Sequence, residues 1–273
     1  MGSVYLSSPA PTRIGTLADR QQAGAALLQL TVLVAIDPGP AGWLAGLVYA
    51  FGLQVLLAGA VRRADATTLG PADLVTLGRA LLVGGVTAVV ADGWWSGDPR
   101  VEVLVPLAAV ALALDFVDGK VARHTGTVSE LGARFDMETD AFLILVLSVA
   151  AAAVLGPWVL VIGGLRYAFV AVGWLLPWLT GTLPPSFSAK AIAAAQGVVL
   201  VTAVSGLLSL LLTTLLVAAA LTALVWSFAR SVLTLYRTVE PPLPLTGLET
   251  TVVAPQCGSG DGAHACGGQG GDR

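Results

Sequence analysis

Residues 191–229 form a run of 39 positions without one charged side chain, and this run constrains the fold more than any other part of the sequence. As a single helix it would be about 58 Å long at 1.5 Å per residue, nearly twice the hydrocarbon core of a bilayer. Ser205 and Gly206 interrupt the apolar residues, and glycine readily adopts turn conformations. We therefore predict two antiparallel membrane-spanning helices that are separated at this dipeptide.

The remainder of the chain is similarly apolar. Of the 273 residues, 56% are hydrophobic and only 11% are charged, whereas about 25% are charged in an ordinary soluble domain. We predict an all-α polytopic membrane protein with about eight transmembrane helices. Before the uncharged run, the predicted helices are residues 23–36, 41–61, 74–91, 101–114, 141–155 and 157–179. The fourth of these should continue through Asp118, and the fifth should begin near Arg134.

The basic residues predict how these helices are oriented. With the N-terminus in the cytoplasm, eleven Lys and Arg residues fall in cytoplasmic segments, and Arg100 alone falls in an outer loop. This asymmetry follows the positive-inside rule. It places both termini, and the acidic stretch between the fourth and fifth helices, at the cytoplasmic face of the cell membrane.

The two ends of the chain lack the apolar pattern of the helices. Residues 1–22 are mostly polar and do not have the pattern of a secretory signal. Residues 240–273 are rich in Pro and Gly and predict a disordered cytoplasmic tail. Cys257 and Cys266 lie in this tail at a spacing that fits no metal site, so we interpret them as unpaired thiols. No block of Lys and Arg suggests a nucleic-acid partner.

Four aspartates lie within 26 residues of the acidic stretch, although a charge near the bilayer centre costs about 2.5–3.5 kcal/mol. At 100° per residue they fall on one face of each of two successive helices, together with small residues. The first face holds Asp115, Asp118, Gly119 and Ala122, and the second holds Gly132, Asp136 and Asp140. Two such faces turned toward one another would bring four carboxylates together.

Carboxylates in such a group repel one another, and one or two divalent cations would remove the conflict. Ligands made only of oxygen favour Mg²⁺ or Mn²⁺ over zinc. The small residues leave room for a ligand, and the guanidinium of Arg123 suits a phosphate. The pattern therefore predicts a pyrophosphate site. The alternative is an ion-paired helix junction, in which Asp118 or Asp136 binds Arg123 or Arg134.

The order of these residues is more specific than their chemistry. The sequence reads D-x2-D-G-x2-A-R-x8-G-x3-D-x3-D from Asp115 to Asp140. All eight fixed positions match, so the segment resembles the signature of the CDP-alcohol phosphotransferase family. Members of this family have six transmembrane helices, and the signature joins the second and third on the cytoplasmic side. The resemblance implies a six-helix catalytic domain at residues 62–239, preceded by an extra hairpin at residues 23–61.

The resemblance also implies roles for the signature residues. Two ions of Mg²⁺ or Mn²⁺ would be held by Asp115, Asp118, Asp136 and Asp140. The carboxylate of Asp140 would in addition take the proton from the acceptor hydroxyl. The CDP group would be bound by Gly119, Ala122, Arg123 and Gly132.

The segment GPADLVTLGRALL, which leads into the first core helix, is similar to a second feature of the family. Thr76 and Arg79 match this feature and would join in binding the CDP group. Asp73 stands where the family has Asn. A hydroxyl bonded to the backbone at the helix start is the alternative interpretation of Thr76.

Two basic residues outside these motifs are candidate phosphate ligands. Arg166 lies within a predicted helix, where an ionisable residue indicates a function; it could meet an acceptor phosphate or pair with a buried acid. Lys190 begins a helix and could face an acceptor or lipid phosphate, or extend its ammonium to the membrane surface. Glu138 is two residues from both Asp136 and Asp140, so it should point away from them.

Together these features predict a membrane-embedded transferase. We expect it to pass the phosphatidyl group of CDP-diacylglycerol to a small alcohol in phospholipid synthesis and to release CMP. Glycerol phosphate, inositol phosphate, serine and inositol all fit as acceptors. Membrane lipids and a second copy of the chain are further expected partners, because members of the family are often homodimers. The alternatives are a divalent-cation transporter and a catalytically silent assembly partner.

Overall fold

The computed structural model describes residues 17–63, 71–125, 130–175 and 187–239. Within these ranges, the side chains of residues 17–19, 60–63, 71–72, 116–125, 130–131, 133–134, 174–175, 187–190, 235 and 237–239 are not described. The elements are α1 (Leu17–Ile36), α2 (Pro40–Arg63), α3 (Pro71–Ser96), α4 (Val101–Thr125), α5 (Glu130–Leu155), the 3-10 turn η1 (Pro157–Val159), α6 (Leu160–Leu175), α7 (Phe187–Ser205) and α8 (Leu210–Val239). The described part of the chain is therefore all-helical.

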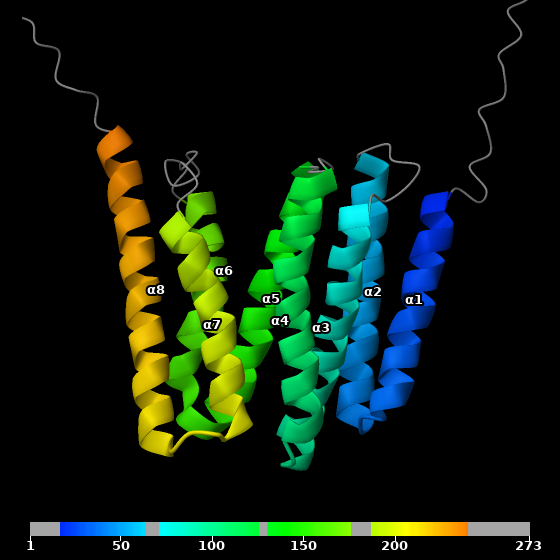
Figure 1. Ribbon diagram of the computed structural model, residues 1–273, viewed down its shortest axis with the longest axis horizontal. Helices are drawn as coiled ribbons and strands as arrows, with labels where there is room; N and C mark the ends of the chain where they lie inside the picture. The colour runs from blue at the N-terminus through cyan, green and yellow to red at the C-terminus, as the bar shows by residue number, and fades with distance from the viewer. Residues whose placement is uncertain (1–16, 64–70, 126–129, 176–186, 240–273) are drawn as a thin grey trace, which may run out of the picture.

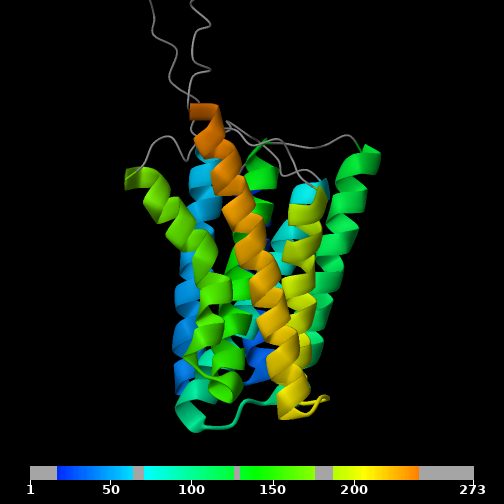
Figure 2. The ribbon, with the colours of Figure 1, turned by 90° about the vertical axis from the view of Figure 1, so that its left-hand side faces the viewer.

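Successive helices run in opposite directions, so that α1, α3, α5 and α7 begin at the same end of the bundle (Figures 1 and 2). The C-terminal halves of α2 and α4 reach that same end, which is uppermost in both views. We call it the aspartate end, because the acidic stretch of the sequence lies at the end of α4 and the start of α5. The opposite end is called the far end.

The predicted division of the long uncharged run is confirmed. Helix α7 ends at Ser205 and α8 begins at Leu210. Gly206 has a φ angle of +67°, a left-handed conformation that glycine adopts without the penalty of a Cβ atom. The chain reverses direction at this turn and returns toward the aspartate end as α8 (Figure 1).

Several other helix bounds differ from the predicted ones. Helix α1 begins at Leu17, α3 spans Pro71–Ser96, and α8 continues to Val239. The predicted helix at residues 157–179 begins instead with the short turn η1, because Gly156 has a φ of +95° and Pro157 follows it. Helices α4 and α5 reach Thr125 and Glu130, several residues beyond the predicted limits at Asp118 and Arg134. The polar signature is therefore largely helical.

The protein is an integral membrane protein. Four helices of the described part are long and apolar enough to cross a membrane, and two further apolar helices are shorter. The four are Pro40–Gly59 in α2, Asp73–Ser96 in α3, Phe135–Leu155 in α5 and Leu210–Thr234 in α8, and the shorter two are Pro157–Gly173 and Ala191–Ser205. Helices α1 and α4 complete the bundle (Figure 1).

Helix α3 is the most enclosed of the four long apolar helices. It packs on α1, α2, α4 and α5, and 67% of its membrane window is buried, against 22% for α2 and 17% for α8. The main partners of α4 are α3 and α7, and those of α5 are α3, α6 and α7. The separation between α4 and α5 is therefore set largely by the helix that lies between them.

Polar contacts at the far end attach the N-terminal hairpin of α1 and α2 to α3 and to the connection between α3 and α4. The guanidinium of Arg100 donates to the carbonyl oxygens of Ile36 at 2.9 Å and Asp37 at 3.2 Å, where α1 ends. The carboxylate of Asp92 lies beside Gly39 at the start of α2, since a Cβ atom on Gly39 would come within 2.3 Å of its Oδ1 atom. A cation at a helix C-terminus and an anion at an N-terminus are both stabilising.

Close packing between α5 and α6 depends on a glycine. A Cβ atom at Gly163 would lie 2.5 Å from the Cα atom of Leu145, which is backbone and cannot move independently. The adjacent Gly164 has nothing within 4 Å of the same position. Small residues allow such approach between membrane helices, whose association depends on van der Waals packing.

This pair of glycines gives a matched test of the packing. We expect Gly163→Ala to lower the free energy of unfolding by about 1–3 kcal/mol, the usual cost of overpacking. Gly164→Ala should be neutral or stabilising by up to about 1 kcal/mol, because alanine is the better helix former. Thermal unfolding of the two variants in detergent measures the difference. Equal transition temperatures would contradict the described contact between α5 and α6.

Candidate active site

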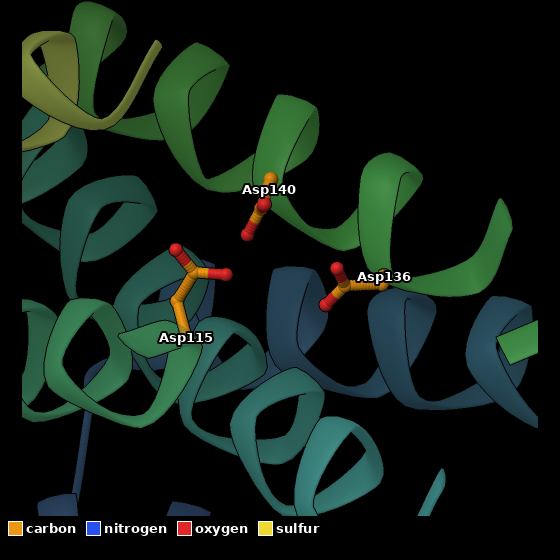
Figure 3. Close-up of side chains that lie close together, drawn as sticks. All are labelled: Asp115, Asp136 and Asp140. Atoms are coloured by element: carbon orange, nitrogen blue, oxygen red, sulfur yellow. The ribbon is translucent and has the colours of Figure 1, made fainter. Parts of the chain in front are cut away.

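Three carboxylates from two helices share one space at the aspartate end of the bundle. Asp115 comes from α4, and Asp136 and Asp140 come from α5, where their i, i+4 spacing puts them on one face. Figure 3 shows the three side chains turned toward one another. One carboxylate oxygen of each lies within 4.8 Å of those of the other two, and all three side chains are half-buried.

The guanidinium of Arg79 on α3 joins these carboxylates. Its Nη1 atom donates to Asp115, and its Nη2 atom donates to the carboxylate of Asp136 and lies 3.1 Å from that of Asp140. The same Nη2 atom also lies 3.3 Å from the backbone carbonyl oxygen of Asp136. The side chain of Arg79 is fully buried. A buried charge needs partners, and the partners of this guanidinium come from both α4 and α5.

The electrostatic balance of this cluster favours a further cation. Three carboxylates and one guanidinium carry formal charges of −3 and +1, which sum to −2. The ligand atoms are all carboxylate oxygens, the donors that Mg²⁺ and Mn²⁺ prefer. The residues present therefore fit a divalent cation, in agreement with the type of site that the sequence predicts.

The structure brings together three of the four aspartates that the sequence singles out. Thr76 is buried on α3 one turn before Arg79, and Gly132 lies on α5 one turn before Asp136. Their roles in binding a CDP group stay predictions. The remaining predicted site residues have side chains outside the described part: Asp118, Gly119, Ala122, Arg123 and Lys190.

Arg79 contacts the clustered aspartates directly, and the sequence does not predict this contact. The motif suggests a contact with the CDP group, and the structure places the guanidinium among the aspartates themselves. An ion-paired helix junction is also present, with Arg79 as the described partner of Asp136. The signal in the sequence was a single arginine as the one charged residue between Asp73 and Asp92, and such a residue needs a counter-ion within the bundle.

Arg166 forms a second ion pair on the other side of α5. Its Nη2 atom donates to the Oε1 atom of Glu138 at 2.6 Å. Glu138 lies two residues from both Asp136 and Asp140, so the pair faces α6 and not the carboxylate cluster. This contact is the acid pairing that the sequence allowed, although the Glu138 side chain is exposed. A role of Arg166 toward an acceptor phosphate stays a prediction.

One protein-family model matches a region of the chain that includes the residues of the site. The family model described as CDP-alcohol phosphatidyltransferase matches residues 69–229, which are 161 of the 273 residues. The matched region runs from α3 into α8 and contains Arg79 and all three clustered aspartates. Searches of curated proteins and of solved structures gave no match.

Replacing Arg79 tests its part in the cluster. In metal-free protein, Arg79→Gln leaves three carboxylates without this counter-ion, and we expect unfolding to require about 1–3 kcal/mol less. This is below the cost for a fully buried pair, because the carboxylates are partly exposed. Added Mg²⁺ should stabilise the variant less than the wild type, because the guanidinium no longer holds the three carboxylates in a common arrangement. Thermal unfolding with EDTA and with Mg²⁺ measures both effects.

Arg166→Gln is the matched control, since it removes an arginine from an ion pair with an exposed acid. Its effect on stability should stay within about 1 kcal/mol, with no dependence on Mg²⁺. An Arg79→Gln variant as stable as the wild type in EDTA would show that the guanidinium does not compensate the aspartates.

Proposed function

Because the chain belongs to the CDP-alcohol phosphatidyltransferase family, we propose that it transfers the phosphatidyl group of CDP-diacylglycerol to a small alcohol and releases CMP. The family makes it a transferase that uses a CDP-alcohol donor and an alcohol acceptor in the membrane. The observation that carries the proposal is the group of three carboxylates joined by Arg79 inside the matched region.

A groove on the membrane-facing side of the bundle supports a lipid donor. Its volume is about 310 Å³, and it lies between α4 and α7. The lining residues are Ala109, Leu112, Ala113, Val198, Val201 and Thr202. Leu112 is one helical turn from Asp115, so an acyl chain in this groove would lead away from a phosphate at the aspartates.

In this proposal the aspartates have two roles, which are to bind the cation and to accept the hydroxyl proton. The acceptor hydroxyl oxygen attacks the phosphorus of the phosphatidyl group, and the bond from that phosphorus to CMP breaks, with CMP taking the electron pair. The carboxylate of Asp140 takes the hydroxyl proton as the general base. Arg79 is proposed to share in neutralising phosphate oxygens, for which a guanidinium fork is suited.

The cation would be held by Asp115, Asp118, Asp136 and Asp140, with two ions of Mg²⁺ or Mn²⁺ as in the family resemblance. When bound there, a divalent cation draws negative charge from pyrophosphate oxygens and makes CMP a better leaving group. The CDP group is proposed to contact Thr76, Gly119, Ala122, Arg123 and Gly132. Lys190 and Arg166 are the weaker candidates for an acceptor or lipid phosphate.

We further propose that the aspartate end faces the cytoplasm, with both termini on that side of the cell membrane. The support is the distribution of basic residues, eleven of which fall in segments assigned to that side and one in an outer loop. CDP-linked substrates and CMP are then exchanged with the cytoplasm. The division of the chain into an N-terminal segment, a hairpin, a catalytic bundle and a tail, at residues 1–22, 23–61, 62–239 and 240–273, stays a prediction.

The positions of the acidic residues do not favour a cation transporter. Among the described residues, acidic side chains lie toward the aspartate end or at the far end. Helix α4 carries none between Glu102 and Asp115, a distance of about 20 Å along the helix. A transport path would need polar groups to bridge that distance.

Turnover in detergent tests the proposed reaction. With CDP-diacylglycerol and Mg²⁺, the protein should release CMP when glycerol phosphate, inositol phosphate, serine or inositol is supplied. EDTA should abolish release and Mn²⁺ or Mg²⁺ should restore it, because carboxylate oxygens favour these ions. No CMP release with any of these acceptors, or full turnover without metal, would contradict the proposal.

Two aspartate variants serve as the internal comparison. Asp115→Asn removes an anionic ligand and should weaken donor binding in Mg²⁺. Asp140→Asn should keep measurable donor affinity while turnover falls by about 10²–10⁴-fold, the usual scale for a general base. Donor titration by calorimetry, alongside the CMP assay, gives the ratio of lost turnover to lost affinity. Near-normal turnover of Asp140→Asn would exclude it as the base.

A further inference from the structure

Tyr49 reaches the active-site helices from outside the matched family region. It lies on α2 of the N-terminal hairpin, whereas the match begins at residue 69. Its hydroxyl donates to the backbone carbonyl oxygen of Ala80 at 2.8 Å, the residue next to Arg79. Its ring packs on that of Phe142 with centroids 5.4 Å apart, two residues after Asp140. One side chain therefore touches both α3 and α5 beside the cluster.

The fit around Tyr49 leaves little room for adjustment. A Cβ atom at Gly84 of α3 would come within 2.7 Å of the Cδ1 atom of Tyr49 and within 2.6 Å of the Nε2 atom of Gln29. Tyr49 also contacts both hydrophobic core clusters of the described bundle. A ring enclosed in this way fixes where α2 lies along the length of α3. Its hydroxyl fixes the position of Ala80, which belongs to α3.

The position of α3 along the bundle axis matters because Arg79 of this helix bonds to the aspartates of the cluster. Helices α4 and α5 both pack on α3 and have few contacts with each other. The carboxylates of Asp115 and Asp136 are both bonded to Arg79, which follows any displacement of Ala80. A shift of α3 therefore changes the arrangement of ligands that come from two different helices.

We propose that Tyr49 is a positioning residue for the transfer reaction: by holding Ala80, it keeps Arg79 in register with the aspartates of α4 and α5. The inference rests on the proposed function and adds to it a residue of the hairpin. It gives the hairpin a part in catalysis that acts through α3.

Tyr49→Phe is the sharpest variant, because it keeps the ring on Phe142 and removes only the hydroxyl. The full-length variant should bind Mn²⁺ about threefold to tenfold more weakly, the range expected for loss of one hydrogen bond, as measured by Mn²⁺ electron paramagnetic resonance. The rate constant kcat for CMP release should fall by at least the same factor. The KM for the acceptor should stay within about twofold, since the hydroxyl of Tyr49 is bonded to the backbone of α3.

Arg100→Gln is the matched control. It removes a second attachment of the same hairpin to the core, at the far end and away from the aspartates. It should lower the unfolding temperature and leave Mn²⁺ affinity and kcat unchanged when measured below that temperature. If Tyr49 served only to hold the hairpin in place, the two variants would behave alike, and this result would overturn the inference.

A double-mutant cycle tests the path through Arg79. In an Arg79→Gln background, Tyr49→Phe should have little further effect on Mn²⁺ affinity, because the group that it positions is absent. Additive effects would overturn the inference, as would normal Mn²⁺ affinity and kcat in Tyr49→Phe alone. A wild-type protein that binds no Mn²⁺ and releases no CMP would instead overturn the proposed function, and the inference with it.

Discussion

The interaction on which the rest of the site depends is the ion pairing of one buried guanidinium with carboxylates from two helices. Arg79 is fully enclosed, and it bonds to Asp115 of α4 and to Asp136 of α5. Removing any one charge from such a group leaves the others without compensation in a poorly solvated place. The cluster therefore holds α3, α4 and α5 together and at the same time retains a net negative charge for a divalent cation.

The membrane makes this arrangement more demanding, because helices there gain little from the hydrophobic effect against one another. Specific contacts have to set their positions. At the far end Arg100 binds the carbonyl groups that terminate α1, and nearer the aspartates the hydroxyl of Tyr49 binds the carbonyl of Ala80. Between α5 and α6 the absence of a side chain at Gly163 allows the backbones to approach. Each contact fixes one helix against a neighbour.

The helices and the shared face of the aspartates could be predicted from the sequence, because the signals for them are local. Uncharged runs interrupted by Gly206 or by Asp37 and Pro38 predict the helices, and i, i+4 spacing puts Asp136 and Asp140 on one face. The position of Arg79 could not be predicted, since it bonds to residues 36 and 57 positions away in the chain, and only the packing of helices decides which arginine meets which acid. The contact of Tyr49 with Ala80 has no sequence pattern at all. The short turn before α6 was not predicted, because Pro157 suits the first position of a continuous helix equally well.

The central claim is that the clustered aspartates bind the divalent cation that holds the donor pyrophosphate. Anomalous scattering from Mn²⁺ in crystals of the protein with CDP-diacylglycerol tests it most directly. The account predicts a manganese peak in contact with carboxylate oxygens of Asp115, Asp136 and Asp140, at about 2 Å as expected for a small hard cation, with the pyrophosphate bound to the same ion. A pyrophosphate bound elsewhere, or manganese bound at other residues with the three aspartates still occupied only by Arg79, would contradict it.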